Sequence, residues 1–427
     1  MNKGVIAVLV VLAAAVLVAP AIVGRMAEKS MDENLNWAAR ESGELTVRSE
    51  RFDRGWFSSE GRHRIELRDG QLVTALQGAG TDADELPVLI VHTKIDHGIA
   101  QVATGAGDLV STMQLELADG RIVELPGTIH SRVGLGGSLR SNYVLEAGSL
   151  AEGEASAAWG DADVTIEADP STGEAEFDGE VGSLSIGDGK ESLSLAGLTF
   201  EGTQKRTRFG LATGRIAFSL SDLTVRSPGN PPAGIRSMSV NAVTDMDDDR
   251  VGADASLSMA VHRVPRIGEM SFDVDLHLAG ADAEALGRMQ QAMKDARSSA
   301  QDPTAVAATI EDDLKQLFAA GFEMRFDRFE VTLPQGTAQM KMQLEFAKRD
   351  PATFDWTSLL LSAEATVDVS IPAAVVDTAG RDNPQVAMAV GGGFLVRQDD
   401  VYVMKAQLKK GLATVNGAPI PIPLGGF

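Results

Sequence analysis

The stretch QMKMQLEF, residues 339–346, alternates polar and apolar side chains without a break. Because successive side chains of a β-strand point to opposite faces of a sheet, it predicts a strand with one apolar and one polar face. The apolar side, Met340, Met342, Leu344 and Phe346, needs either a packing layer or a ligand to cover it. Core packing is the simpler interpretation. These four residues are nevertheless the ligand-binding candidates, because methionine adapts to irregular ligands.

The same period of two recurs along most of the chain after residue 60. The alternating stretches are Ile65/Leu67, Leu115/Leu117, Leu184/Ile186, Leu193/Leu195, Ile216/Phe218/Leu220, Phe272/Val274/Leu276/Leu278, Val367/Val369 and Val401/Val403. Turns are predicted at the Asp-Gly pairs 69–70, 119–120, 178–179 and 188–189. Strands with one wet face favour antiparallel sheets. The predicted fold is therefore mainly β: a large antiparallel body, as a curved sheet or sandwich-like, with a small helical hairpin.

The helical hairpin is predicted over about residues 282–320, where the period changes to that of a helix. Asp302-Pro303 is a typical N-cap and first-turn proline for the second helix, and Gly321 is a plausible stop. The predicted apolar faces are Leu286, Met289 and Met293 in the first helix, and Val306, Ile310, Leu314, Leu317 and Phe318 in the second.

Residues 227–232, SPGNPP, interrupt the strand pattern because proline and glycine break strands. They separate a first β-rich region, 43–226, from a second, 233–427, which includes the helical hairpin. The segment is either a linker between two domains or a long loop within one continuous body. The sequence leaves both interpretations open.

Residues 4–23, GVIAVLVVLAAAVLVAPAIV, are apolar and uncharged. A helix of this length is about 30 Å long and crosses a hydrocarbon core. Cleavable signals have a shorter apolar centre, and Pro20 disturbs the small-residue cleavage pattern, so an uncleaved anchor is favoured over a cleaved signal. Residues 1–25 are thus predicted to form a cytoplasmic tip and transmembrane anchor, and 26–42 a membrane-proximal helix. The bulk of the chain would lie outside the cytoplasm.

Composition excludes several classes of function. With 38 Lys and Arg against 60 Asp and Glu, the net charge is −22, which disfavours binding to nucleic acid and to anionic lipid surfaces. The chain has no cysteine, so it forms no disulfide, thiolate metal site or cysteine nucleophile. Glycine is abundant at 44 residues, which suits many short strands joined by turns.

Two clusters of acidic residues are conceivable metal sites. Asp273, Asp275 and His277 share one face of a predicted strand, where a metal could bridge them, but a solvated strand face is the simpler interpretation. Asp245 and residues 247–249 lack the glycine and terminal glutamate of a calcium-binding loop, and a turn is favoured. No metal site and no cofactor is therefore expected.

No catalytic pattern stands out either. His92 and His97 are five residues apart, which is not a two-ligand spacing, and residues 134–137 lack the Lys-Ser/Thr ending of a phosphate loop. No serine nucleophile motif with a matching histidine is evident. The chain is expected not to be an enzyme, with a hydrolase of unrecognised site as the remaining enzymatic alternative.

Three motifs carry a family resemblance. Arg54-Gly55-Trp56-Phe57-Ser58 ahead of a strand, FDRFEVTLPQG at residues 326–336, and Asn416-Gly417 near the end resemble, in this order, the YdgA-like family of bacterial inner-membrane-anchored periplasmic proteins. The resemblance implies a β-rich periplasmic body and no activity, so no functional residue is carried over. In structural terms, Gly55 permits a turn or bulge, Trp56 and Phe57 supply apolar surface, and Asn416-Gly417 favours a type I′ hairpin.

These observations favour a non-enzymatic, membrane-anchored periplasmic protein. It would be single-pass in the bacterial inner membrane through residues 4–23, with its amino terminus cytoplasmic. A curved sheet could then hold a lipid or another apolar ligand on its apolar face. The alternative is a scaffold or assembly factor that binds other envelope proteins through sheet edges. The sequence also leaves a homodimer open.

Overall fold

The computed structural model describes residues 45–54, 58–67, 86, 88–96, 106–117, 120–134, 138–152, 155–169, 171–187, 189–264, 268–299, 303–351, 354–355, 359 and 361–421. The anchor predicted over residues 4–23 and the helix predicted over 26–42 lie outside these ranges. Within these ranges, no helix combines the length and the apolar character that crossing a membrane requires. The chain divides into two compact units, residues 1–205 with 218–232, and residues 206–217 with 233–427.

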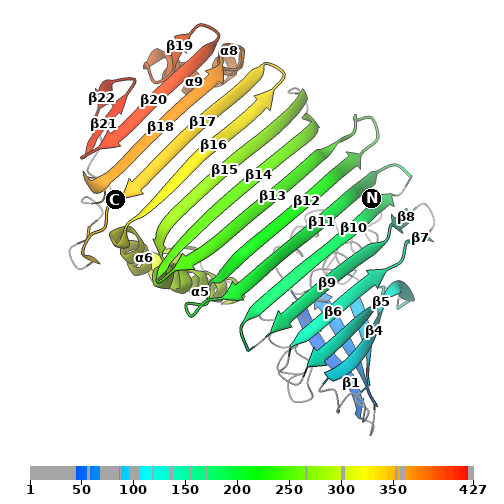
Figure 1. The fold of residues 1–427 in the computed structure, drawn as a ribbon. Coiled ribbons are helices and arrows are strands. Elements are labelled where there is room, and N and C mark those ends of the chain that lie inside the picture. The colour runs from blue at the N-terminus through cyan, green and yellow to red at the C-terminus, as the bar shows by residue number, and fades with distance from the viewer. Residues whose placement is uncertain are drawn as a thin grey trace. The chain divides into compact units, whose positions relative to one another are not determined.

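The first unit is built from antiparallel strands (Figure 1). Its strands are β1 (Leu45–Arg54), β2 (Ser58–Leu67), β3 (Val88–Asp96), β4 (Ala106–Glu116), β5 (Ile122–Gly134), β6 (Leu139–Leu145), β7 (Gly148–Glu152), β8 (Ala155–Trp159), β9 (Ala162–Asp169), β10 (Glu174–Gly187) and β11 (Ser192–Arg206). They pair in the order β1-β2-β3-β4-β5-β6-β9-β10-β11, and the hairpin β7–β8 joins the end of β10. β12 (Ala212–Arg226) has residues in both units.

One face of the first unit's sheet forms a buried core. Apolar side chains at alternate positions from β1 to β10 pack into one cluster, and Leu89, Leu109, Met113 and Leu115 are almost fully buried. Tyr143 is also buried there, and this burial raises the pKa of its phenol well above the usual range. The period of two predicted from the sequence is thus realised in this unit as a closed apolar interior.

The second unit is also built from antiparallel strands, so the prediction of a mainly β, antiparallel chain is confirmed. Its strands are β13 (Ala233–Asp247), β14 (Arg250–Val264), β15 (Gly268–Asp282), β16 (Phe322–Leu333), β17 (Gly336–Phe346), β18 (Ala363–Pro372), β19 (Val396–Gln398), β20 (Val401–Lys409), β21 (Leu412–Val415) and β22 (Ala418–Ile420). They pair in sequence order from β13 to β18, then β18-β20-β21-β22, while β19 pairs with the start of β20.

The predicted helical hairpin is present as α5 (Ala283–Ser299) and α6 (Pro303–Ala320). Leu286 and Met289 pack against the sheet as predicted, together with Leu317, but Met293 is exposed because it lies one turn beyond the packed part of α5. Gly321 ends α6 with a positive φ of 74°, as a helix-stopping glycine does.

The carboxyl end of α6 is held by an arginine of the sheet. The Arg250 guanidinium donates hydrogen bonds to the carbonyl oxygens of Gly280, Gly321 and Ala320, at 2.8, 3.2 and 3.0 Å. The carbonyl of Ala320 lies in the last turn of α6, where the helix itself supplies no donor, so the arginine satisfies it and ties the end of α6 to β14 and β15.

A second helical pair lies outside the sequence-based predictions. It consists of α8 (Ala373–Asp382) and α9 (Pro384–Gly391), which follow β18 directly. Figure 1 shows this pair at the opposite end of the second unit's strands from α5 and α6.

Two detailed predictions are corrected by the structure. Asp178-Gly179 lies within β10 and forms no turn; Gly179 is opposite Phe200, and a Cβ would lie 2.6 Å from the ring atom Cζ, so the glycine makes room for that ring. Val401 and Val403, which alternate as the predicted apolar side of their own strand, lie on the opposite face of the sheet from Val367 and Val369. The pairing of β18 with β20 instead sets Met404 opposite Val369 and Tyr402 opposite Ile371.

Candidate functional site

The sheet of the second unit has one continuous apolar face. Three rows of side chains, in register from strand to strand, cross it. We call these three rows the apolar face. They are Val240–Leu257–Val274–Phe329–Met340–Val369–Met404, Ala242–Ala255–Leu276–Phe326–Met342–Val367–Ala406 and Ala253–Leu278–Met324–Leu344–Ala365–Leu408. Met340, Met342 and Leu344, predicted as ligand-binding candidates, lie at its centre; Phe346 lies at one end.

Methionine is concentrated on this side of the sheet. Eight of the chain's 15 methionines are on it: Met238, Met246, Met259, Met270, Met324, Met340, Met342 and Met404. The methionine thioether is flexible and polarisable, and such surfaces adapt to apolar partners of irregular shape. Sequence reasoning identifies only two of the eight, because the others become neighbours through strand pairing.

A β-bulge keeps the apolar face continuous across β16. Phe326 and Phe329 are three residues apart and would point to opposite faces of a regular strand. The register shifts between them, so that Phe326 pairs with Met342 and Phe329 with Met340. The two rings therefore lie on the same face, with centroids 6.4 Å apart. Asp327 and Arg328 form the bulge, and the Arg328 side chain bonds an acid of the other face.

The apolar face is only half-buried, unlike the core of the first unit. Every residue of its three rows retains intermediate exposure, whereas Leu89, Met113 and Leu115 in the first unit are at most 2% exposed. A face covered by a second layer would reach that lower value. The first two rows belong to none of the buried clusters formed by the described residues.

The two helical pairs cover opposite ends of the apolar face. At one end the Phe318 ring of α6 lies 4.9 Å from Phe346 and 5.5 Å from Phe322, centroid to centroid. At the other end α8 and α9 pack over Ile371 and Tyr402. The central part of the apolar face therefore lies between α5 and α6 at one end of the strands and α8 and α9 at the other end.

The opposite face of the same sheet is polar and internally paired. The Ser258 hydroxyl donates to Asp273 at 2.6 Å, Arg328 Nε donates to Asp275 at 2.8 Å, and His277 Nδ1 lies 2.6 Å from an Asp254 carboxylate oxygen. The hydrogen bond to Asp275 is the main cause of the raised pKa of Arg328. The predicted same-face stripe of Asp273, Asp275 and His277 exists, and each member has its own partner.

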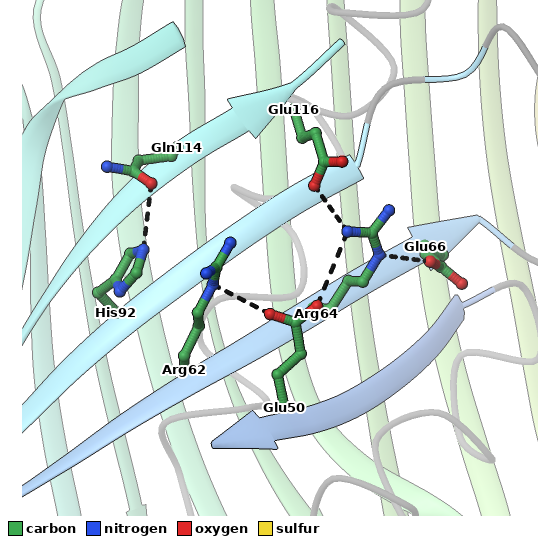
Figure 2. A network of polar contacts seen from close by, with 7 residues as sticks. All are labelled: Glu50, Arg62, Arg64, Glu66, His92, Gln114 and Glu116. Atoms are coloured by element: carbon green, nitrogen blue, oxygen red, sulfur yellow. Dashed lines mark hydrogen bonds and ion pairs between the residues drawn. The ribbon is translucent and has the colours of Figure 1, made fainter. Parts of the chain in front are cut away.

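The first unit carries a charged network, shown in Figure 2. Arg64 donates from Nε to Glu66 at 2.7 Å and from a terminal nitrogen to Glu116 at 2.6 Å, and Arg62 pairs with Glu50 at 3.0 Å. The hydrogen bond to Glu66 is the largest cause of the raised pKa of Arg64. These arginines form ion pairs with carboxylates from β1, β2 and β4. The network therefore joins the strands and leaves little uncompensated positive charge to bind a ligand.

The other sequence candidates do not converge on a site. His92 Nε2 lies 3.1 Å from the Gln114 side-chain oxygen, a contact drawn in Figure 2. His63 is buried in the first unit's core, and His97 lies outside the described residues. The acidic residues 247–249 form the turn between β13 and β14, where Asp248 has a positive φ. Gly134 ends β5, where its amide donates to Ser138 O at 2.8 Å; residues 135–137 are outside the described ranges.

Comparison with known proteins places the chain in a family. Residues 1–423 match the family described as bacterial protein of unknown function, DUF945. The chain belongs to this family. No curated protein and no solved structure matches it significantly.

Two of the three motifs behind the predicted resemblance have structural roles among the described residues of this DUF945 protein. Asn416 and Gly417 have φ values of 50° and 82° and form the predicted hairpin turn between β21 and β22. Arg54 ends β1 and Ser58 begins β2, while Gly55, Trp56 and Phe57 lie outside the described residues. The segment 326–336 runs from β16 through a turn into β17, as predicted.

Proposed function

We propose that this DUF945 protein holds the acyl chains of a lipid, or of a lipid-like molecule, on the apolar face of its second unit, without catalysing a reaction. The observation that carries this proposal is the half-buried state of three in-register apolar rows. Acyl chains are uncharged and flexible, which suits a broad methionine-rich surface better than a defined pocket.

In the proposed arrangement, the protein belongs to the bacterial envelope. The support is the uncharged run over residues 4–23, which is long enough to anchor the chain, and the family's bacterial description. In this arrangement the anchor keeps a lipid-binding body beside its source of lipid, with that body on the periplasmic side.

The test uses the intact chain, extracted in mild detergent from carbonate-washed membranes, in which an anchored protein remains. Phospholipid bound per protein is then measured by mass spectrometry. Met340→Gln/Met342→Gln is expected to retain roughly tenfold less lipid than the unmodified chain. Full burial of a methionine contributes about 1.5 kcal/mol, so covering the remaining exposed half of each side chain contributes about 0.7 kcal/mol, and the two together about 1.4 kcal/mol.

The matched control is Lys341→Gln/Gln343→Ser, which changes the polar face of the same strand. It is expected to retain as much lipid as the unmodified chain. Equal lipid in both double variants would contradict the proposal. A stable dimer that carries no lipid and dissociates in Met340→Gln/Met342→Gln would instead show that a second copy covers the face, and would also overturn it.

A further inference from the structure

The surface of α9 and of the turn after it is apolar and outward-facing. Residues 383–396, NPQVAMAVGGGFLV, contain no charged side chain. α9 has no buried residue, and Met388 is 73% exposed and Phe394 41% exposed, with Val396 exposed beside them. We call residues 384–396 the apolar tip.

Backbone groups of the apolar tip have hydrogen-bond partners, so the tip is a folded segment and not a frayed end. Asn383 caps α9 by accepting a hydrogen bond from the Gln385 amide at 2.9 Å. The amides of Phe394 and Leu395 donate to Ala389 O at 2.9 and 3.0 Å. The Asn416 side chain donates to the carbonyl oxygens of residues 393 and 394, at 2.9 and 3.1 Å. The apolar tip is therefore held in place by hydrogen bonds while its side chains are exposed.

The inner side of the apolar tip is continuous with the apolar face. Val386, Val390 and Leu395 pack against a buried cluster that includes Tyr402. Tyr402 and its partner Ile371 lie on the same side of the sheet as Val369 and Met404. The inner side chains of the apolar tip are therefore linked, through this cluster, to the rows that are proposed to hold acyl chains.

The chemistry of the tip fits a lipid bilayer better than a protein. It consists mainly of alanine, glycine and valine with one methionine and one phenylalanine, and it has none of the tryptophan, tyrosine or arginine anchors typical of protein interfaces. An eight-residue helix is too short to span a membrane but long enough to lie in its surface. Because the whole chain carries a charge of −22, such contact depends on apolar insertion and not on attraction to anionic lipid.

We propose that the apolar tip inserts into the surface of a lipid bilayer, where acyl chains can pass between the bilayer and the apolar face. The passage of acyl chains rests on the proposed function; the insertion does not. A failure of lipid retention in the Met340→Gln/Met342→Gln experiment therefore leaves the test of insertion intact.

The test uses the full chain reconstituted in phosphatidylcholine vesicles, with and without phosphatidylglycerol. The chain has no cysteine, so Met388→Cys provides a single site for a fluorophore. Leu412→Cys is the matched control, because Leu412 is 72% exposed in the same unit but lies on β21, beside the end of β20 remote from α9. Quenching by nitroxide groups on the lipid acyl chains is then measured.

The label at Met388→Cys is expected to be quenched at least several-fold more than the label at Leu412→Cys, equally in both lipid mixtures. Adding Phe394→Asp and Val396→Asp is expected to abolish this excess. Equal quenching at the two positions would overturn the proposal. It would also be overturned if the Met388→Cys label were shielded in native membranes but not in pure lipid vesicles, which would indicate a protein partner.

Discussion

Leu115→Ala is expected to lower the free energy of unfolding of the first unit by about 3 kcal/mol, the usual cost of a cavity in a well-packed core. Leu115 is 1% exposed and lies on β4 opposite Leu89 of β3, which is 2% exposed. Hydrogen–deuterium exchange of β3 and β4 peptides measures this cost for the first unit separately, which a single unfolding midpoint would not do in a chain of two units.

The same substitution on the apolar face is expected to be mild. Leu344→Ala removes a half-buried side chain between Met324 and Ala365, so less than about 1 kcal/mol of burial is lost. Hydrogen–deuterium exchange of β16 and β17 peptides measures this loss of free energy of unfolding. A loss for Leu344→Ala as large as that for Leu115→Ala would contradict the account, because it would mean that a second layer covers the face.

Gly321→Ala is the second substitution with a large expected effect. Gly321 has a φ of 74°, and a Cβ there would lie 2.6 Å from Phe346 O and 2.8 Å from Lys348 N. The left-handed conformation costs alanine about 1–2 kcal/mol. Because the colliding atoms are backbone, displacing them adds a further cost, for a total of about 3 kcal/mol or more. The measurement is exchange of α6 and β17 amides.

Gly417→Ala separates the two costs of Gly321→Ala, the conformational cost of a positive φ and the cost of the steric collision. Gly417 has a similar φ of 82° and lies in the same unit, but a Cβ there would meet no atom of the described residues within 4 Å. It is expected to cost only the conformational term, about 1–2 kcal/mol. If both variants cost the same, the collision with Phe346 and Lys348 contributes nothing, and the tight packing inferred at the end of α6 is wrong.

Much of the fold follows from local sequence patterns. The alternation over residues 339–346 correctly predicts β17 and its two-faced character, and Asp302-Pro303 with Gly321 predicts the limits of α6 to within a residue. Asn416-Gly417 predicts its turn because few other residue pairs adopt two positive φ angles easily. These features depend on neighbouring residues, which a sequence displays directly.

The second helical pair carries a local signal of the same kind. Asn383-Pro384 is a capping residue followed by a first-turn proline, and it has the same sequence pattern as Asp302-Pro303, from which the start of α6 is predicted. The run of alanine and valine around it resembles a strand as much as a helix, which explains why the pattern alone does not predict this pair. The exposed residues of the apolar tip, Met388 and Phe394, therefore emerge only from the structure.

Other features depend on pairing, which the sequence does not display. The bulge at Asp327 and Arg328 places Phe326 and Phe329 on one face, whereas strict alternation would separate them. The face of β20 is likewise decided by its register with β18. Most importantly, the same alternation gives a buried core in the first unit and a half-exposed face in the second, because exposure depends on what lies above the sheet.

Accessibility of the apolar face to a small thiol reagent tests the central claim most directly. In the delipidated full chain, the Met342→Cys thiol is expected to react with N-ethylmaleimide nearly as fast as the Gln343→Cys thiol on the polar face, and far faster than the Met113→Cys thiol in the first unit's core. Added phospholipid is expected to slow only the Met342→Cys reaction. Reaction of Met342→Cys as slow as that of Met113→Cys, with or without lipid, would show that the face is closed and that no lipid binds there.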